Sequence, residues 1–286
     1  MLPQLISSSL GWVRDQASAK AEDALISILS AGPIPQHVAF ILDGNRRYAR
    51  SKGMQVKQGH TDGFYTLRRM LEICIKLNVR CVSAYAFSIE NFKRSPEEVT
   101  ALMDLAEDKL LELCQQGDIL DRYGIRLVVV GNRDMLPERV LAAAEKAESL
   151  TKNNNRAVFN LCMPYTSRDE ITTAVHKVIQ SRLDGADDTD ITKDDIEAHL
   201  MTSIAGSPPL DILVRSSGVK RLSDYMLWQV RHIVSSISDA VFIATMQCSE
   251  DTQLQFSSTY WPEFGLLDFM PIILDYQRKV WSKTSQ

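Results

Sequence analysis

Short apolar runs alternate with longer segments of helical periodicity along most of this chain, and this alternation restricts the fold more than any other feature. The apolar runs occupy residues 38–42, 79–87, 125–131, 157–163 and 211–216. Apolar residues recur every three to four positions in the segments between them, such as 96–116, 137–152 and 167–182. Strands separated by helices pair in parallel, because the helix returns the chain to the same end of the sheet. We therefore expect a single α/β domain with a mostly parallel central sheet flanked by helices.

Polar and charged residues follow three of the apolar runs, at the points where strands would end. Asp43 follows the first run, the segment from Ser88 to Arg94 follows the second, and the segment from Arg215 to Ser223 follows the last. The carboxyl ends of parallel strands meet at one edge of the sheet, where α/β proteins bind ligands. These remote segments should therefore converge into one site.

The first of these segments, HVAFILDGNRRYAR over residues 37–50, predicts an anion site. Gly44 and Asn45 favour a strand-to-helix turn with exposed N–H groups. The paired arginines that follow can each bind phosphate oxygens through two parallel hydrogen bonds. Asp43 offers a hard oxygen ligand that suits Mg²⁺. On spacing alone, an ordinary Asp-Gly turn with solvated arginines fits equally well.

Composition argues against several other classes of protein. The chain has 286 residues, of which 45% are hydrophobic, and this is enough for one large buried core. The formal net charge of −4 argues against a general nucleic-acid binder. Five cysteines form no CxxC pair and no metal-ligand spacing, as expected of apolar residues in a reducing compartment.

Three motifs together resemble the signatures of the cis-prenyltransferases, which extend an allylic diphosphate with isopentenyl diphosphate in Z geometry. They are HVAFILDGNRRYAR at 37–50, AYAFSIENFKRS at 84–95 and DILVRSSGVKRLSDYMLWQ at 211–229. The motifs stand in the family's order, which makes chance a poor explanation. The resemblance implies the family's α/β fold and a catalytic domain over residues 34–286.

The resemblance also implies an Mg²⁺-dependent transferase with site residues in all three motifs. Asp43 would orient Mg²⁺ on a farnesyl-like allylic diphosphate. Isopentenyl diphosphate would be held by Arg215, Arg221 and Ser223. Binding of the allylic substrate is implied for Gly44, Asn45, Arg46, Arg47, Tyr48 and His60.

The second motif would set the new double bond. By resemblance, Asn91 helps to remove the departing proton, Phe92 orients the substrate and Arg94 contacts phosphate, while Ser88 and Glu90 complete the substrate-binding motif. An amide is a weak base, so we expect Asn91 to position the proton, with released pyrophosphate as a candidate acceptor.

The growing chain requires an apolar cavity, because each methylene removed from water is worth about 0.8 kcal/mol. We expect a tunnel lined from residues 99–113 and 125–130, whose depth sets product length. The apolar stripe in the first of these segments fits a plain hydrophobic core at least as well. It consists of Leu102, Leu105, Leu110 and Leu113.

Residues 1–33 are predicted to form a separate amphipathic helical segment, with a polar middle that includes Lys20 and Glu22. It lacks a basic stretch followed by a cleavable apolar core, so we do not expect a secretory signal. Two interpretations stay open. The helix lies on a membrane or closes over the tunnel, or it packs on its own domain.

Residues 230–247, VRHIVSSISDAVFIATMQ, interrupt the course that the family follows after the third motif. Without them, Gln229 would join Cys248 and lead to Trp261-Pro262-Glu263 as in the family. The stretch begins with Val, whose codons start with GT, and ends with Gln, which CAG encodes. We therefore expect a retained intron in the gene model, with a genuine surface loop as the alternative.

Two features of self-sufficient family members are missing where they are expected. Residues 276–286 contain no Arg-X-Gly phosphate clamp, and only Glu250 or Asp251 stands near the place of a second acidic metal ligand. These departures resemble eukaryotic catalytic subunits that make dehydrodolichyl diphosphate, a long-chain polyprenyl precursor of dolichol for protein glycosylation. They imply a non-catalytic partner of the same fold that supplies the clamp, and a peripheral site on the cytosolic face of the endoplasmic reticulum. A self-sufficient homodimer and a subunit impaired by the insertion are the alternatives.

Overall fold

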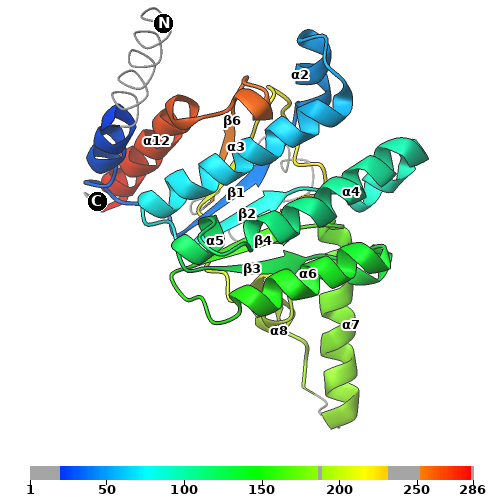
Figure 1. Ribbon diagram of the computed structural model, residues 1–286. Coiled ribbons are helices and arrows are strands. Elements are labelled where there is room, and N and C mark those ends of the chain that lie inside the picture. Colours follow the sequence, from blue (N-terminus) through cyan, green and yellow to red (C-terminus); the bar gives the residue numbers. More distant parts are fainter. Residues whose placement is uncertain (1–19, 186–188, 231–251, 285–286) are drawn as a thin grey trace, which may run out of the picture.

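The apolar runs form a parallel sheet at the centre of the computed structural model, which describes residues 20–185, 189–230 and 252–284 (Figure 1). The strands are β1 (His37–Ile41), β2 (Cys81–Tyr85), β3 (Ile125–Val130), β4 (Ala157–Cys162), β5 (Ile212–Arg215) and β6 (Gln253–Phe256). Their order across the sheet is β3-β4-β2-β1-β5-β6, and all five pairs are parallel. The predicted α/β architecture is confirmed.

Helices separate consecutive strands, as a parallel sheet requires. The labelled α-helices of the described residues are α2 (Asn45–Ser51), α3 (Val56–Lys76), α4 (Pro96–Leu113), α5 (Ile119–Arg122), α6 (Glu138–Thr151), α7 (Ser167–Gly185), α8 (Lys193–Ala198), α9 (Met201–Ile204), α10 (Leu227–Val230) and α12 (Leu266–Thr284). The described residues also form the short 3-10 helices η1 (Ile89–Lys93), η2 (Arg133–Met135) and η4 (Trp261–Glu263). Helices α3, α4 and α6 cross one face of the sheet (Figure 1).

Both faces of the sheet are buried, and β1 shows why its sequence is apolar throughout. Val38 and Phe40 belong to the larger hydrophobic cluster, whereas Ala39 and Ile41 belong to a smaller cluster on the opposite face. Successive side chains of a strand point to opposite faces, so a strand covered on both sides must be apolar at every position.

The described part of the N-terminal segment packs on the domain itself. Residues 20–29 are helical, Ile26 and Leu29 are buried, and Nε2 of Gln277 on α12 donates to the carbonyl of Leu29 at 2.6 Å. Figure 1 shows this helix beside α12. Residues 1–19, for which membrane contact is the alternative, lie outside the described residues.

The described residues on either side of the anomalous segment, Gln229 and Thr252, are in contact. Oγ1 of Thr252 donates to the carbonyl of Leu210 at 2.7 Å and to that of Gln229 at 3.4 Å. Nε2 of Gln229 donates to Glu170 at 3.0 Å and to Thr202 at 2.9 Å, which fixes this end of the segment. Apart from Val230, the predicted insertion lies outside the described residues. The contact between its flanks means that a short connection would suffice.

Deleting residues 230–247 should therefore leave the fold intact, because Cys248 to Asp251 can still join Gln229 to Thr252. A shorter connection loses less conformational entropy when folding brings its ends together. The free energy of unfolding should therefore stay equal or rise by about 1.5 kcal/mol. Urea unfolding of the deletion variant and of the full chain measures this. Loss of the cooperative transition would contradict the expectation, and a transcript that always carries the eighteen codons would exclude a retained intron.

Candidate active site

The carboxyl end of β1 runs into a turn that is fixed through the backbone of Asp43. Its N–H donates to Oγ of Ser216 at 3.0 Å, and its carbonyl accepts from the N–H of Trp261 at 2.9 Å. Gly44 follows with φ of 105°, and a Cβ there would lie 2.8 Å from the ring of Tyr260. Only glycine combines this conformation with this close approach. The turn starts α2 directly beside the carboxyl edge of the sheet.

Asp43 forms an ion pair with a buried arginine of the neighbouring strand. Ile41 of β1 stands opposite Arg215 of β5, and Nη2 of Arg215 lies 2.8 Å from Oδ2 of Asp43. Nη2 of Arg47 lies 3.4 Å from the same oxygen. Burial alone would raise the pKa of Asp43, but hydrogen bonds from Arg215 and Ser217 and the charges of both arginines hold this pKa below its ordinary value. Asp43 is therefore ionised at neutral pH and can hold a hard cation.

Arg215 also fixes the loop that follows β5. Its Nη1 donates to Oγ of Ser223 at 2.8 Å, and Nε of Arg221 donates to the same oxygen at 3.3 Å. Ser223 has φ of 52°, and the hydroxyl of Tyr85 donates to its carbonyl at 3.2 Å. Left-handed backbone at a residue other than glycine is uncommon and concentrates at functional sites. Asp43, Arg215, Arg221 and Ser223 thus form one continuous cluster.

The second motif forms η1, which is capped by its own polar side chains. Oδ1 of Asn91 accepts from the N–H of Ser88 at 3.1 Å, and Oγ of Ser88 accepts from the N–H of Glu90 at 3.2 Å. Because the cap uses the amide oxygen of Asn91, its NH₂ group is the part left for a ligand, and that group donates hydrogen bonds rather than accepting protons. The role expected of Asn91 stays a prediction, and this geometry is compatible with positioning a proton.

These segments surround one open pocket at the carboxyl edge of the sheet, which we call the polar pocket. It is lined by thirteen of the fifteen predicted site residues: Asp43, Gly44, Asn45, Arg46, Arg47, His60, Ser88, Glu90, Asn91, Arg94, Arg215, Arg221 and Ser223. Seven arginines and three carboxylates contribute to its wall. This excess of positive charge attracts multiply charged anions, although the chain as a whole is acidic.

The other two predicted residues do not line the polar pocket. Tyr48 lies on α2 under Lys52, whose Nζ is 5.8 Å from the centre of its ring. Phe92 packs edge-on against Phe87 with ring centroids 4.9 Å apart, since its apolar ring is better covered by the core than by the charged pocket. Phe92 therefore supports Phe87, which lines the apolar cavity described below.

Two further arginines of the polar pocket, Arg50 and Arg168, were not expected from the sequence. Nε of Arg168 donates to Oδ2 of Asp224 at 2.7 Å, which joins the start of α7 to the loop of the third motif. Arg168 follows the apolar run at 157–163, so the rule that ligands bind after strand ends could have found it.

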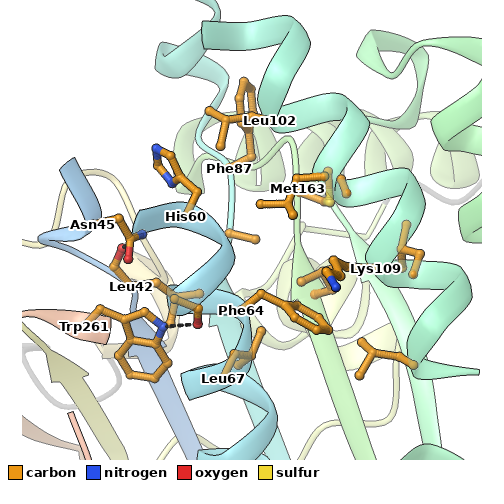
Figure 2. Close-up of a pocket in the computed structure, with 17 residues that line it drawn as sticks. Leu42, Asn45, His60, Phe64, Leu67, Phe87, Leu102, Lys109, Met163 and Trp261 are labelled. Carbon is orange, nitrogen blue, oxygen red and sulfur yellow. Dashed lines mark hydrogen bonds between the residues drawn. The ribbon is translucent and has the colours of Figure 1, made fainter. Parts of the chain in front are cut away.

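An apolar cavity lies between α3 and α4 (Figure 2). All four leucines of the α4 stripe line it, as expected from residues 99–113. The expected contribution from residues 125–130 is wrong, because β3 lies at the edge of the sheet and β4 stands between it and β2. Leu161 and Met163 at the end of β4 line the cavity instead.

The apolar cavity and the polar pocket share a rim. Leu42, Asn45, His60, Ala86 and Leu102 line both of them. Oδ1 of Asn45 and Nε2 of His60 are buried there without a hydrogen-bond partner among the described residues. Burial, with a smaller contribution from the charge of Arg94, lowers the pKa of His60 to about 4. His60 is therefore neutral at pH 7, and the rim presents two unsatisfied polar groups to a ligand.

Comparisons with known proteins identify the family of the chain. Residues 41–282 match the family described as "Putative undecaprenyl diphosphate synthase", and the chain belongs to this family of prenyl-transferring enzymes. A dehydrodolichyl diphosphate synthase complex subunit of Schizosaccharomyces pombe is 42% identical over 269 residues, which cover 94% of this chain and 93% of the relative. The corresponding complex subunit of Homo sapiens is 37% identical over 94% of this chain and 74% of its own length.

A solved structure shows the same fold. The crystal structure of lavandulyl diphosphate synthase from Lavandula x intermedia, in complex with dimethylallyl diphosphate, matches with a TM-score of 0.72 and 31% identity. The match covers 85% of this chain and 95% of that one. The family and the fold predicted from the three motifs are therefore confirmed.

Replacing His60 with glutamine should flatten the dependence of stability on pH. The pKa of His60 is lower in the folded protein than in the unfolded chain, so the unfolded chain takes up the proton first as the pH falls below about 6.5. The neutral form of His60 therefore contributes to the free energy of unfolding. This contribution is full above pH 6.5 and is lost toward pH 4, with about 2 kcal/mol lost between pH 7 and pH 5. Urea unfolding of His60→Gln should lack this loss, whereas the exposed control His176→Gln should follow the wild type. Equal losses in wild type and His60→Gln would contradict a buried neutral imidazole.

Proposed function

We propose that the chain condenses isopentenyl diphosphate onto an allylic diphosphate of farnesyl type and makes a long-chain polyprenyl, dehydrodolichyl, diphosphate for dolichol synthesis. The observation that carries this proposal is the shared rim at Asn45 and His60, where a cationic pocket opens into an apolar cavity. A prenyl diphosphate has the same two parts, a polyanionic head and an apolar tail. The names of the relatives from Schizosaccharomyces pombe and Homo sapiens support the product.

The residues of the polar pocket would hold two diphosphates side by side. Arg46 and Arg47 with the rim residue His60 would bind the allylic head, and Arg215 and Arg221 would bind isopentenyl diphosphate. These guanidiniums are positioned before the substrates arrive, so they stabilise the pyrophosphate most as it gains charge in the transition state. Asn91 would orient the carbon that loses its proton.

Mg²⁺ fits the site at Asp43. The carboxylate is ionised and lines the polar pocket, where phosphate oxygens of a bound substrate would complete the coordination of the cation. When bound, Mg²⁺ would neutralise charge on the leaving pyrophosphate. Asp43 would then exchange Arg215 for the cation, which releases the guanidinium for a phosphate.

We further propose that the chain works with a partner subunit of the same fold, which supplies an Arg-X-Gly clamp. The relatives in Schizosaccharomyces pombe, Homo sapiens and Saccharomyces cerevisiae are named as subunits of a complex, which supports this proposal. Residues 276–286 contain no such clamp.

A peripheral location on the cytosolic face of the endoplasmic reticulum is also proposed. A polyprenyl product partitions into membranes, and the apolar residues before Lys20 could lie on a bilayer. Within the ranges that the structure describes, none of the helices combines the length and apolar character needed to cross a bilayer.

The variant Asp43→Asn should lose at least a hundredfold in the rate of label incorporation from isopentenyl diphosphate at saturating Mg²⁺, because the carboxylate that holds the cation is gone. Its unfolding transition should remain cooperative. Asp134→Asn, at an exposed aspartate outside the pocket, is the matched control and should keep wild-type activity. Unchanged activity of Asp43→Asn within the complex would indicate a scaffold subunit instead of a catalytic one.

Purified alone with Mg²⁺ and both diphosphates, the chain should incorporate label at least tenfold more slowly than after co-expression with a clamp-bearing partner of the same fold. The physical reason is that one phosphate would lack its clamp. The two preparations are compared in the same incorporation assay. Strong turnover by the chain alone would refute the partner proposal and favour the self-sufficient homodimer.

A further inference from the structure

A strained turn carries the serine of the third motif. Four of the five described non-glycine residues with positive φ lie between residues 217 and 226. Three of them are Ser223, Asp224 and Met226, with φ of 52°, 58° and 48°. Left-handed backbone is unfavourable for residues with a Cβ, so several of them in one turn persist only where the surroundings hold them. The contacts of this turn therefore show what keeps Ser223 in place.

Tyr85, the last residue of β2, holds the turn in two ways. Its ring stacks on that of Tyr225, with centroids 4.3 Å apart and 9° between the planes. Its hydroxyl donates to the carbonyl of Ser223 at 3.2 Å and to that of Tyr165 at 3.1 Å. A phenol has one proton, so the two carbonyls share it. The contact with Ser223 joins β2 to a turn that lies 138 residues later in the chain.

The side chain of Ser223 faces the arginines of the polar pocket. Its Oγ accepts hydrogen bonds from Nη1 of Arg215 at 2.8 Å and from Nε of Arg221 at 3.3 Å. A hydroxyl has two acceptor positions and one proton. With both acceptor positions occupied, the proton is what this hydroxyl still offers, and the residue lines the pocket. Ser223 thus presents an O–H donor beside two guanidiniums, which suits a phosphate oxygen.

The hydroxyl of Tyr85 is directed at the protein itself. Tyr85 lines the polar pocket, but only 8% of the residue is exposed, and its proton is already shared by two carbonyls. Burial raises the pKa of Tyr85 above its ordinary value, so the phenol keeps this proton at neutral pH. Tyr85 is therefore placed to act on the pocket through Ser223.

We propose that Tyr85 is a positioning residue, which fixes Ser223 and the two arginines bonded to it for the diphosphate of isopentenyl diphosphate. This inference rests on the proposed function and gives a role to a residue of the second motif that has none so far. Without the phenol, the carbonyl of Ser223 loses its partner and the left-handed turn can relax. The hydroxyl of Ser223 then leaves the place where it meets the phosphate.

The variant Tyr85→Phe tests the proposal, because phenylalanine keeps the ring on Tyr225 and removes only the hydroxyl. The KM for isopentenyl diphosphate should rise about fivefold, the loss expected for one hydrogen bond. This diphosphate is not cleaved, so its binding is the same before and during the reaction, and kcat should change less than twofold. The KM for the allylic diphosphate should also stay within twofold.

Initial rates of label incorporation give these constants, in whichever preparation turns over, alone or with the partner. Tyr123→Phe is the matched control, since it removes a hydroxyl that is bonded to Glu72 at 2.8 Å and lies outside the polar pocket and the apolar cavity. It should keep both KM values. Loss of kcat in Tyr85→Phe without a selective rise of the KM for isopentenyl diphosphate would indicate a merely structural role and would overturn the proposal.

A double variant separates positioning from direct contact. If Tyr85 acts through the hydroxyl of Ser223, adding Tyr85→Phe to Ser223→Ala should raise the KM by less than a further twofold. Calorimetric titration with isopentenyl diphosphate gives the same comparison without turnover. Effects that multiply in the double variant would mean that the phenol meets the substrate itself, and they would overturn the positioning role. Unchanged KM and affinity in Tyr85→Phe would do the same, whereas no incorporation by any wild-type preparation would overturn the proposed function.

Discussion

The ion pair between Asp43 and Arg215 is the interaction on which the rest of the site depends. Arg215 is only 3% exposed, and a guanidinium at that depth requires a counter-charge, since removing one partner of a buried pair costs about 3 to 5 kcal/mol. The parallel register of β1 and β5 brings the two side chains together. The same guanidinium then fixes Ser223 and, through it, the loop that carries Arg221. Under the proposed function, a cation and a phosphate would replace contacts that the protein already makes to itself.

The site joins two regions of opposite chemistry that meet at a narrow rim. On one side, arginines from α2, the end of η1, α7, the end of β5 and the loop after it gather positive charge. On the other side, α3 and α4 enclose an apolar space, in which Lys109 is the one formal charge among the described lining residues. Asn45 and His60 stand between the two regions with buried polar atoms that no described residue satisfies. Because His60 is neutral, the rim separates the charged region from the apolar one without adding a charge of its own.

Much of the fold and of the polar pocket could be predicted from the sequence, and the misses have physical causes. The five apolar runs form strands β1 to β5, and the ends of each strand lie within two residues of the ends of its run. The agreement arises because burial on both faces of a parallel sheet demands continuous apolar sequence. Tyr48 and Phe92 do not line the polar pocket, since Tyr48 packs under Lys52 and Phe92 against Phe87, and their expected contact with the substrate stays a prediction. Residues 125–130 were assigned to the cavity because nothing in the sequence says that β3 is an edge strand. Arg168 was missed although it follows a strand end.

The sequence by itself determined the class of fold, the family and the identity of most polar groups of the site, because periodicity, turn residues and charge are local properties of the chain. Only the tertiary structure decided which of these groups meet. The order of strands across the sheet, which sets β5 beside β1, makes Arg215 the partner of Asp43, and the approach of α3 to α4 places Tyr65 and Phe64 around Lys109. Such contacts join residues far apart in the chain, and they follow from packing that no local pattern records.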